Sequence, residues 1–466
     1  MTRYRMTPGD AAWLHMDRAT NHMIVNSVMW FDEPMDWDAV RAVVQDRIVE
    51  RFPRFSQRVL DLPTSIWWED DADFDLDNHL HHAALPSPGG RAELERYLSG
   101  LLHAPMPTSQ PLWELHLIDG YNGRGSAIVS RLHHCIADGV ALMRVMMSLT
   151  DDADEADEAD VLDAVQGRRS GILPSFAHLA GTVAETVAGN LVHPSRVVDS
   201  VRDGASAALT LTKLLAMPPD ANTALRGRAG LNKQVVWSDP TPLRKVSAAA
   251  HAAGVTVNDL VLAAVSGALR AYLAREDGHS PDIRAIMPVN LRPLDEPLPA
   301  ELGNRFGLAF LTLPVSIDDP QQRLVEVCRR STAIKHSPEG LVTFEVLGVT
   351  GRTPYAVEQL IVDVFASKGT AVMTNVPGPR RAVFLAGRKV RGTIGWPPVS
   401  GNMSTGLSII SYDGELIIGL MTDTGLVPDP QFILAEIQRE IADLIQVEDA
   451  TAEQPSVAGP VTSSQH

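Results

Sequence analysis

The order of apolar and polar positions predicts strands along most of the chain. Segments that are continuously apolar, or that alternate with polar residues, and that are rich in β-branched side chains are typical of strands. Strands are expected at residues 23–31, 66–69, 113–118, 126–130, 233–237, 283–289, 306–315, 371–374, 407–412 and 415–420. Asp413 and Gly414 separate the last two and predict a hairpin turn.

Apolar residues three and four positions apart predict helices between these strands. A short helix is expected within residues 1–20, and Asp36 should cap a helix that ends before Pro53. A helix from Thr241 should end at Gly254, and the next, from Thr256, is apolar nearly all round and should be buried. A last helix is expected at 429–445. The strand, acid and helix order of residues 306–328 repeats that of 23–52, which favours two similar α/β halves.

Two adjacent histidines, His133 and His134, follow the strand at 126–130, where it passes into a turn. An apolar helix follows, with Asp138 or Gly139 near its cap. Because successive strand residues point to opposite faces, one imidazole can face a cavity while the other faces the core. A partly buried histidine is the usual general base near neutral pH. On spacing alone, a structural histidine pair before an Asp-Gly turn is the more common arrangement.

Metal binding is less expected from these residues. Adjacent strand residues diverge, and Cys135 has no second cysteine nearby for a zinc cage. A second cluster contains His79, His81 and His82, of which the first two could share a strand face and contact a metal. No acid or cysteine has ligand spacing with them, so we favour an exposed polar edge there and expect no metal site.

Length, charge and cysteine content exclude several classes of protein. A chain of 466 residues, 45% of them hydrophobic, can form one very large domain or two of ordinary size. The net charge of −17 argues against nucleic acid as a partner. Two cysteines make no disulfide framework, which fits a reduced cytosol. We find no signal-peptide pattern and no apolar run of about 18 residues that would span a bilayer.

The central stretch, His133-His134-x-x-x-Asp138-Gly139, resembles the HHxxxDG motif of coenzyme A-dependent acyltransferases. Further stretches resemble, in order, those of the bacterial wax ester synthase/diacylglycerol acyltransferases. These are Thr7-Pro8-Gly9-Asp10-Ala11-Ala12-Trp13-Leu14, Phe74-Asp75-Leu76-Asp77, Pro111-Leu112-Trp113-Glu114, Val257-Asn258-Asp259-Leu260-Val261-Leu262-Ala263, Gly303-Asn304-Arg305-Phe306-Gly307 and Thr374-Asn375-Val376-Pro377-Gly378-Pro379. The resemblance covers roughly residues 5 to 445.

The resemblance implies two chloramphenicol-acetyltransferase-like α/β subdomains with mixed sheets and an active-site tunnel between them. It implies an O-acyltransferase that moves a long acyl chain from acyl-CoA, a co-substrate, to diacylglycerol, giving triacylglycerol. A long-chain fatty alcohol, giving a wax ester, is the second acceptor. No cofactor is expected, and the coenzyme A-binding residues are unknown from the sequence. A condensation-type acyltransferase of specialised metabolism and a catalytically silent lipid-binding protein are the alternatives.

The resemblance also implies roles for single residues. His134, the second motif histidine, is expected to be the general base, and His133 to be supporting. Asp138 should hold the loop by pairing with an arginine, with Arg292 and Arg305 as candidates, and Gly139 should allow a close turn. No G-x-S-x-G elbow occurs in the sequence, and Cys135 is not a nucleophile of the family.

Asn258 begins the buried helix, where backbone N–H groups favour negative charge, and we expect it to polarise the acyl carbonyl or its oxyanion. Asp259 and Thr256 are expected only to cap that helix, as in a capping box. A basic run at residues 380–391 could meet coenzyme A phosphates or anionic lipid heads, but solvated strand ends explain it equally well.

The expected domain organisation has four parts. Residues 1–170 form the subdomain with HHxxxDG, 171–230 a helical crossover, 231–447 the second subdomain and 448–466 a disordered tail. The acidic stretch at 151–163 should be a solvated loop, and the amphipathic segment at 172–215 either covers the interface or lies on lipid. We expect a cytoplasmic protein, peripheral on the inner face of the plasma membrane or on lipid inclusions.

Overall fold

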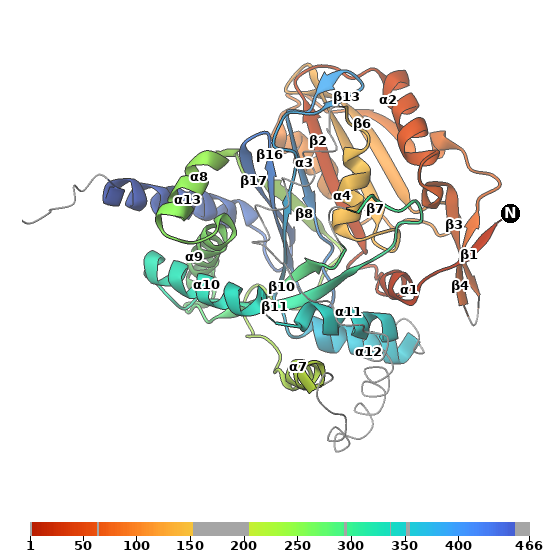
Figure 1. Ribbon diagram of the computed structural model, residues 1–466. Helices are drawn as coiled ribbons and strands as arrows, with labels where there is room; N and C mark the ends of the chain where they lie inside the picture. Colours follow the sequence, from red (N-terminus) through yellow and green to blue (C-terminus); the bar gives the residue numbers. More distant parts are fainter. Residues whose placement is uncertain are drawn as a thin grey trace, which may run out of the picture.

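The computed structural model describes residues 2–62, 65–151, 205–292, 296–335, 337–350 and 355–452. Two large sheets dominate the described part, and the helices lie around them (Figure 1). The predicted acidic loop and most of the predicted amphipathic crossover, including its helices before residue 205, fall outside the described residues. The described part therefore shows the two α/β halves but not the whole connection between them.

The five-stranded sheet of the first half carries the histidine motif. Its order is β15 (Gly392–Trp396), β2 (Ile24–Phe31), β7 (Gly125–His133), β6 (Trp113–Tyr121) and β5 (Leu80–Ala84). Strands β2 and β6 both pair antiparallel with β7, so the motif strand is central, and residues 113–118 pair with it as predicted. A smaller sheet joins β1 (Arg3–Arg5), β4 (Ser65–Asp70) and β3 (Gln57–Leu62).

Four α-helices belong to the described first half: α1 (Pro8–His15), α2 (Trp37–Val44), α3 (Arg91–Leu101) and α4 (Gly139–Met147). Asp36 caps α2 as predicted, since its side chain accepts a hydrogen bond from the backbone N–H of Ala39. Odd-numbered β6 residues such as Leu115 pack in one core with α4, while Ile118 packs on the opposite face with Leu94 and Leu98 of α3. The alternation of the strand thus separates two cores.

The sheet of the second half has the order β11 (Phe306–Leu313), β10 (Ile283–Asn290), β12 (Ala371–Pro377), β16 (Thr405–Tyr412), β17 (Glu415–Asp423) and β8 (Lys233–Trp237). The short β9 (Thr241–Pro242) also pairs with β17. The predicted hairpin turn is present, with positive φ at Asp413 and Gly414. All strands predicted in this half are therefore confirmed.

Seven helices accompany this sheet in the described residues. They are α7 (Ala205–Ala216), α8 (Leu243–Ala252), α9 (Val257–Asp277), α10 (Pro320–Lys335), α11 (Glu339–Thr350), α12 (Tyr355–Ala366) and α13 (Pro430–Ala452). By length and composition α9 is able to cross a membrane, but it is mostly buried in the core, as predicted for it. The last helix reaches Ala452, beyond its predicted end at 445, and the domain boundary at 447 stays a prediction. The rest of the predicted tail falls outside the described residues.

The two halves interlock through β15. This strand belongs to the second half by sequence, yet it pairs with β2 of the first sheet. Gly392 lies against the indole of Trp30, where an added Cβ would come within 2.2 Å of a ring carbon, so only glycine fits without displacing the ring. The ring of Trp237, on β8, stacks 5.9 Å from that of Trp30. The interface between the halves is thus a packed one, and the exact domain boundaries stay predictions.

Candidate active site

The motif lies where β7 ends and α4 begins. The backbone N–H of His134 still donates to the Met23 carbonyl, 2.7 Å away, which continues the β2–β7 ladder by one residue. The two imidazoles then diverge, as predicted. His133 bonds Asp17, and His134 turns toward residues of the second half. Both rings are largely buried, with 1% of His133 and 6% of His134 exposed.

His134 is held by an amide from the second half. Its Nδ1 lies 3.0 Å from Oδ1 of Asn304. The Nδ2 of Asn304 donates to the His134 carbonyl and to Asp10, which leaves Oδ1 as the acceptor facing the ring. The proton of the neutral imidazole therefore lies on Nδ1, and the lone pair lies on Nε2. Nε2 is the atom that can take a proton from a substrate.

Asp10 anchors this amide from helix α1. Its Oδ1 accepts hydrogen bonds from the backbone N–H and from Nδ2 of Asn304, at 3.0 and 2.8 Å. Thr7, the N-cap of α1, donates to the other carboxylate oxygen at 2.7 Å. Burial raises the pKa of Asp10, although these hydrogen bonds oppose that rise. The chain Asp10–Asn304–His134 thus joins both halves at the motif.

Neither Asp10 nor Asn304 is predicted from the sequence to have a role at the site. Both belong to stretches that carry the family resemblance, Thr7 to Leu14 and Gly303 to Gly307. Their place in these two stretches was the sequence signal that could have identified them. The contact between Asp10 and Asn304, however, joins residues 294 positions apart in sequence. Residue spacing carries no information about such a contact.

Two aromatic rings cover the imidazole of His134. Trp13 stacks on it at 4.1 Å between ring centroids, and Phe306 lies at 5.4 Å. Burial lowers the pKa of His134 to about 4, while the nearby charge of Asp138 raises it only in part. A buried imidazole loses hydration in its charged form. The ring is consequently neutral at pH 7, the state that a general base requires.

His133 is bonded at both ring nitrogens, and its supporting role stays a prediction. Its Nδ1 accepts the backbone N–H of Cys135, so the proton lies on Nε2 and is donated to Asp17 at 3.2 Å. His22 also bonds Asp17, at 2.7 Å. Burial would raise the pKa of Asp17, but the hydrogen bonds from His133 and His22 outweigh it and lower that pKa to about 2. Because both ring nitrogens of His133 take part in hydrogen bonds, neither is left as a proton acceptor for a substrate.

Asp138 fixes the loop after the histidines. One carboxylate oxygen caps α4 by accepting the N–H of Ala141, and the other accepts the backbone N–H of Arg305 at 3.0 Å. The guanidinium of Arg292 lies 3.8 Å from that second oxygen. Both candidate arginines therefore meet Asp138, Arg292 through its side chain and Arg305 through its backbone.

The backbone conformation of Gly139 differs from the close turn that was predicted for it. It is the first residue of α4, its φ is not in the left-handed region, and an added Cβ would meet nothing within 4 Å. The close turn expected here does not require a glycine, because the bend is made by the extended backbone of Asp138.

Asn258 lies at the start of α9 and accepts a hydrogen bond at Oδ1 from Nδ2 of Asn375, at 2.9 Å. Its own Nδ2 is thereby left as a donor. Asp259 caps the helix with Thr256 as expected, and it also accepts from Ser331. The structure brings Asn258 together with Asn375, from two of the resemblance stretches, and gives no hydrogen bond between Asn258 and His134 among the described residues.

Several other candidates take structural positions. Cys135 is buried, and burial raises the pKa of its thiol, which makes a poor nucleophile. In the basic run, Arg388, Lys389 and Arg391 pair with surface acids. That pairing favours the solvated-strand interpretation for these three. The exposed edge expected for the histidine cluster is wrong for His79, whose ring is buried against Trp113 at 4.7 Å.

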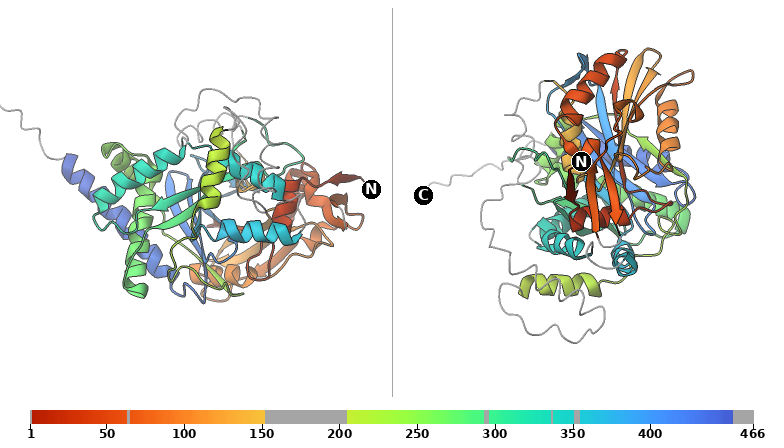
Figure 2. Two further views of the ribbon diagram at one scale, coloured as in Figure 1. Left: turned by 90° about the horizontal axis from the view of Figure 1, so that it is seen from below. Right: turned by 90° about the vertical axis from the view of Figure 1, so that its right-hand side faces the viewer.

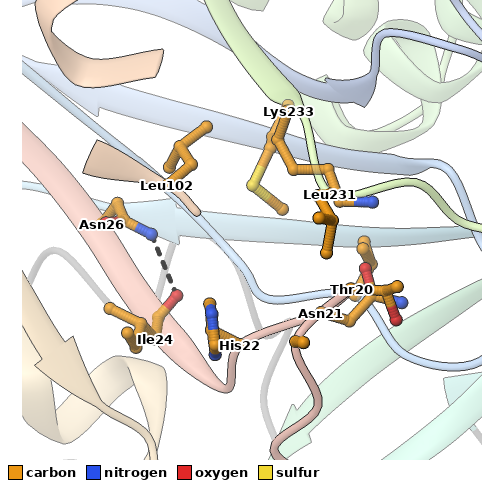
Figure 3. A pocket seen from close by; sticks show the side chains of 11 residues that line it. Thr20, Asn21, His22, Ile24, Asn26, Leu102, Leu231 and Lys233 are labelled. Atoms are coloured by element: carbon orange, nitrogen blue, oxygen red, sulfur yellow. Dashed lines mark hydrogen bonds between the residues drawn. The ribbon is translucent and has the colours of Figure 1, made fainter. Parts of the chain in front are cut away.

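A small cavity lies between the halves, beside this site. The side chains around it include His22 and Asn26 from the first half and Leu231 and Lys233 from the second (Figure 3). Its volume of about 20 Å³ suits roughly one water molecule rather than a lipid. His134 lines neither this cavity nor the one lined by Arg330 and Glu339. The interface position predicted for the motif is confirmed, and the open tunnel stays a prediction.

Two α/β halves with an HHxxxDG histidine at their interface are the arrangement that the resemblance to coenzyme A-dependent acyltransferases implies. Comparison with known families agrees. Residues 6–261 match the wax ester synthase/diacylglycerol acyltransferase catalytic domain, and residues 302–445 match the WS/DGAT C-terminal domain. The chain therefore belongs to the wax ester synthase/diacylglycerol acyltransferase family and is an acyltransferase of that family.

Relatives and solved structures extend over nearly the whole chain. A probable diacyglycerol O-acyltransferase, tgs1, of Mycobacterium tuberculosis is 26% identical over 95% of this chain and 96% of its own length. A putative diacyglycerol O-acyltransferase of the same species is 29% identical over 89% of this chain and 84% of its own. The wax ester synthase/diacylglycerol acyltransferase from Marinobacter aquaeolei VT8 has the same fold, with a TM-score of 0.67 at 21% identity, covering 96% of this chain and 100% of its own.

The first condensation domain of the CDA synthetase shares the fold more distantly. Its TM-score is 0.57 at 15% identity, with 96% of each chain covered. Both structural likenesses show the architecture that the resemblance implied.

Proposed function

We propose that the chain transfers a long acyl group from acyl-CoA to diacylglycerol and, as a second acceptor, to long-chain fatty alcohols. The single observation that carries the chemistry is the neutral imidazole of His134. Its proton is on Nδ1, which bonds Asn304, and the lone pair of Nε2 is left as a proton acceptor. Family membership supports the reaction class, and the names of the mycobacterial relatives support diacylglycerol as the acceptor.

The reaction needs one base and no covalent acyl-enzyme. Nε2 of His134 takes the hydroxyl proton as the acceptor oxygen forms its bond to the thioester carbonyl carbon. The C–S bond then breaks, coenzyme A leaves as a thiolate, and the imidazolium returns the proton to that sulfur. An alcohol is too weak an acid to be ionised by imidazole beforehand, so proton transfer accompanies bond formation. Such positioned base catalysis supplies roughly 10²–10⁴-fold.

Asn258 is our candidate for the group that stabilises the oxyanion. Because Asn375 occupies its Oδ1, its Nδ2 is oriented as a donor at the start of α9. The helix N-terminus adds a favourable field for negative charge. An amide donor of this kind acts on the charge that develops at the former carbonyl oxygen.

The contact surface for lipid is proposed on helices α7, α11 and α12. Leu209 of α7 is 71% exposed, and Tyr355 and Leu360 of α12 are 58% and 54% exposed. The three helices lie together at the bottom of the molecule and face the viewer when it is seen from below (Figure 2). With a net charge of −17, attachment to anionic lipid must rest on apolar insertion rather than on charge.

This surface connects directly to the site. Nδ1 of His15, in α1, lies 2.7 Å from the fully buried carboxylate of Glu358 in α12. The same α1 carries Trp13, which covers His134, and Asp10, which anchors Asn304. We place the protein in the cytoplasm, peripheral on the plasma membrane or lipid inclusions, with the helix that meets lipid next to the helix that covers the base.

Replacing Leu360 by aspartate should weaken vesicle binding by about tenfold, since burying one leucine side chain contributes about 1.5–3 kcal/mol. Cosedimentation with phosphatidylethanolamine and phosphatidylglycerol vesicles measures it. The matched control is Val325→Asp, because Val325 is also well exposed, at 68%, but lies on α10. Equal losses in both variants, or binding that disappears in moderate salt, would contradict an apolar contact through α12.

Acceptor specificity tests the function itself. Purified protein with labelled acyl-CoA should form triacylglycerol from diacylglycerol, and wax ester more slowly from a long-chain alcohol. No ester with either acceptor, together with tight lipid binding, would favour the catalytically silent protein. Acyl transfer only to carrier-bound acceptors would favour the condensation-type enzyme, whose fold the chain shares.

A further inference from the structure

A cluster of metal-ligating side chains lies away from the motif, at the edge of the first sheet. Strands β5 and β6 pair in parallel, with His81 opposite His116, and Glu114 precedes His116 by two residues on the same face. One donor atom from each of the three residues lies within 4.8 Å of the others. This face is the one covered by α3, opposite the core that contains α4. The cluster is thus separate from the catalytic histidines.

His116 provides the observation that points to a ligand. It is 6% exposed, and its Nε2 is buried without a hydrogen-bond partner in the described part of the chain. Its Nδ1 lies 3.0 Å from the Tyr97 hydroxyl, which can accept the ring proton. The lone pair on Nε2 then faces the Glu114 carboxylate, 3.5 Å away. In this tautomer two buried acceptors face each other, which is unfavourable unless a cation lies between them. In the other neutral tautomer Tyr97 donates to Nδ1, the Nε2–H is directed at Glu114, and no cation is needed.

We propose that His81, Glu114 and His116 bind a divalent ion of the zinc class. Two histidines and one glutamate form a donor set that zinc uses, and two donors of a tetrahedral zinc ion lie about 3.3 Å apart. The donor atoms of the three residues lie within 4.8 Å of one another, so binding requires them to approach further. The bond from His116 to Tyr97 matches the outer hydrogen bond that orients a ligating histidine. His81 is only half buried, so water can reach the fourth coordination position of the ion.

Arg131 shares the carboxylate without filling the site. Its Nη1 lies 2.6 Å from Oε2 of Glu114, and its Nη2 bonds the Ala104 carbonyl. Oε2 is also the oxygen 3.5 Å from Nε2 of His116, so the ion would share Oε2 with Arg131 or be bound by Oε1. The competing arrangements are a neutral His116 with its proton on Nε2 and a protonated His116; both direct an N–H at Glu114, require no metal and predict no zinc affinity. In our proposal the ion fastens edge strand β5 to β6, so its effect is on stability and not on the chemistry at His134.

The test uses the full-length protein, stripped with a chelator and titrated with Zn²⁺ by calorimetry. We expect saturable binding of about one ion per chain, a Tm that rises with zinc, and an affinity at least roughly tenfold lower in His81→Ala. His81 is the chosen site because it is partly exposed and its loss leaves the core intact. His82→Ala is the matched control: His82 is on the same strand but bonds Asp119 instead.

Three outcomes would overturn the proposal. The first is an absence of saturable Zn²⁺ binding to the wild-type protein. The second is equal affinity in wild type and His81→Ala, or an equal loss in His82→Ala. The third is binding that disappears in His134→Ala and persists in His81→Ala, which would place the ion at the motif. Acyltransferase activity is not the readout, so failure of this proposal leaves the proposed function untouched.

Discussion

Turnover is expected to fall by roughly 10²–10⁴-fold when His134 is replaced by alanine, with little change in the fold. The variant removes Nε2 of His134, whereas Nδ1 of that ring is bound to Asn304 and both nitrogens of His133 are engaged. The measurement is initial ester formation from labelled acyl-CoA and diacylglycerol, with Tm and circular dichroism as checks of folding.

His133→Ala is the informative partner variant. It leaves the buried backbone N–H of Cys135 without its acceptor, while the partly buried Asp17 keeps its bond to His22. An unsatisfied buried group costs about 1–3 kcal/mol, so Tm should fall more than in His134→Ala. Turnover per folded molecule should fall less. Loss of turnover in His133→Ala at unchanged Tm, with His134→Ala still active, would show that His133 and not His134 is the base.

The local part of this site was predictable because it depends on neighbours in sequence. Strand alternation correctly separates His133 from His134, and the Asp-Gly pair before an apolar run marks the cap of α4. Thr256 and Asp259 form the capping box that their spacing indicates. These features are set by backbone geometry over a few residues, which is the range over which a pattern specifies structure.

The parts that were missed depend on which strands and halves meet. His81 and Glu114 belong to different strands, so no spacing along the chain could reveal that β5 lies parallel to β6. Strand β15 joins the first sheet from the second half, although its sequence resembles any short strand. Likewise, Trp13 can stack on His134 only because helix α1 packs against the motif. Long-range contacts of this kind are decided by packing between elements, not by local periodicity.

The two aromatic rings that cover His134 also change how a substrate is expected to reach its imidazole. The resemblance implies an open tunnel, whereas the ring is enclosed by Trp13 and Phe306, one from each half. Enclosure keeps the imidazole neutral through the loss of hydration, and it excludes water from a thioester that water would hydrolyse. The bond from His15 to Glu358 places α12 beside the helix that carries Trp13.

Asn304→Leu should lower kcat by about 10²-fold while KM for acyl-CoA changes little, because a base held less accurately is less effective. The substitution keeps the side-chain volume but removes the acceptor for Nδ1–H, so Nε2 is no longer fixed as the open nitrogen. Asn304 acts through His134 and is a positioning residue, so the pH profile of kcat/KM is measured together with the rate.

The direction of the pH shift separates positioning from a general loosening of the structure. The wild-type acid limb should lie near pH 4, and losing the bond to Asn304, which favours the charged ring, should move it lower. A loosened site would hydrate the ring and move the limb up toward about 6.5, the ordinary value for histidine. Asn21→Leu is the matched control, since Asn21 is a buried amide that also bonds across the halves, to the Gly401 carbonyl, without contacting His134. An equal loss of kcat in Asn21→Leu, or an upward shift in Asn304→Leu, would show that Asn304 only holds the halves together.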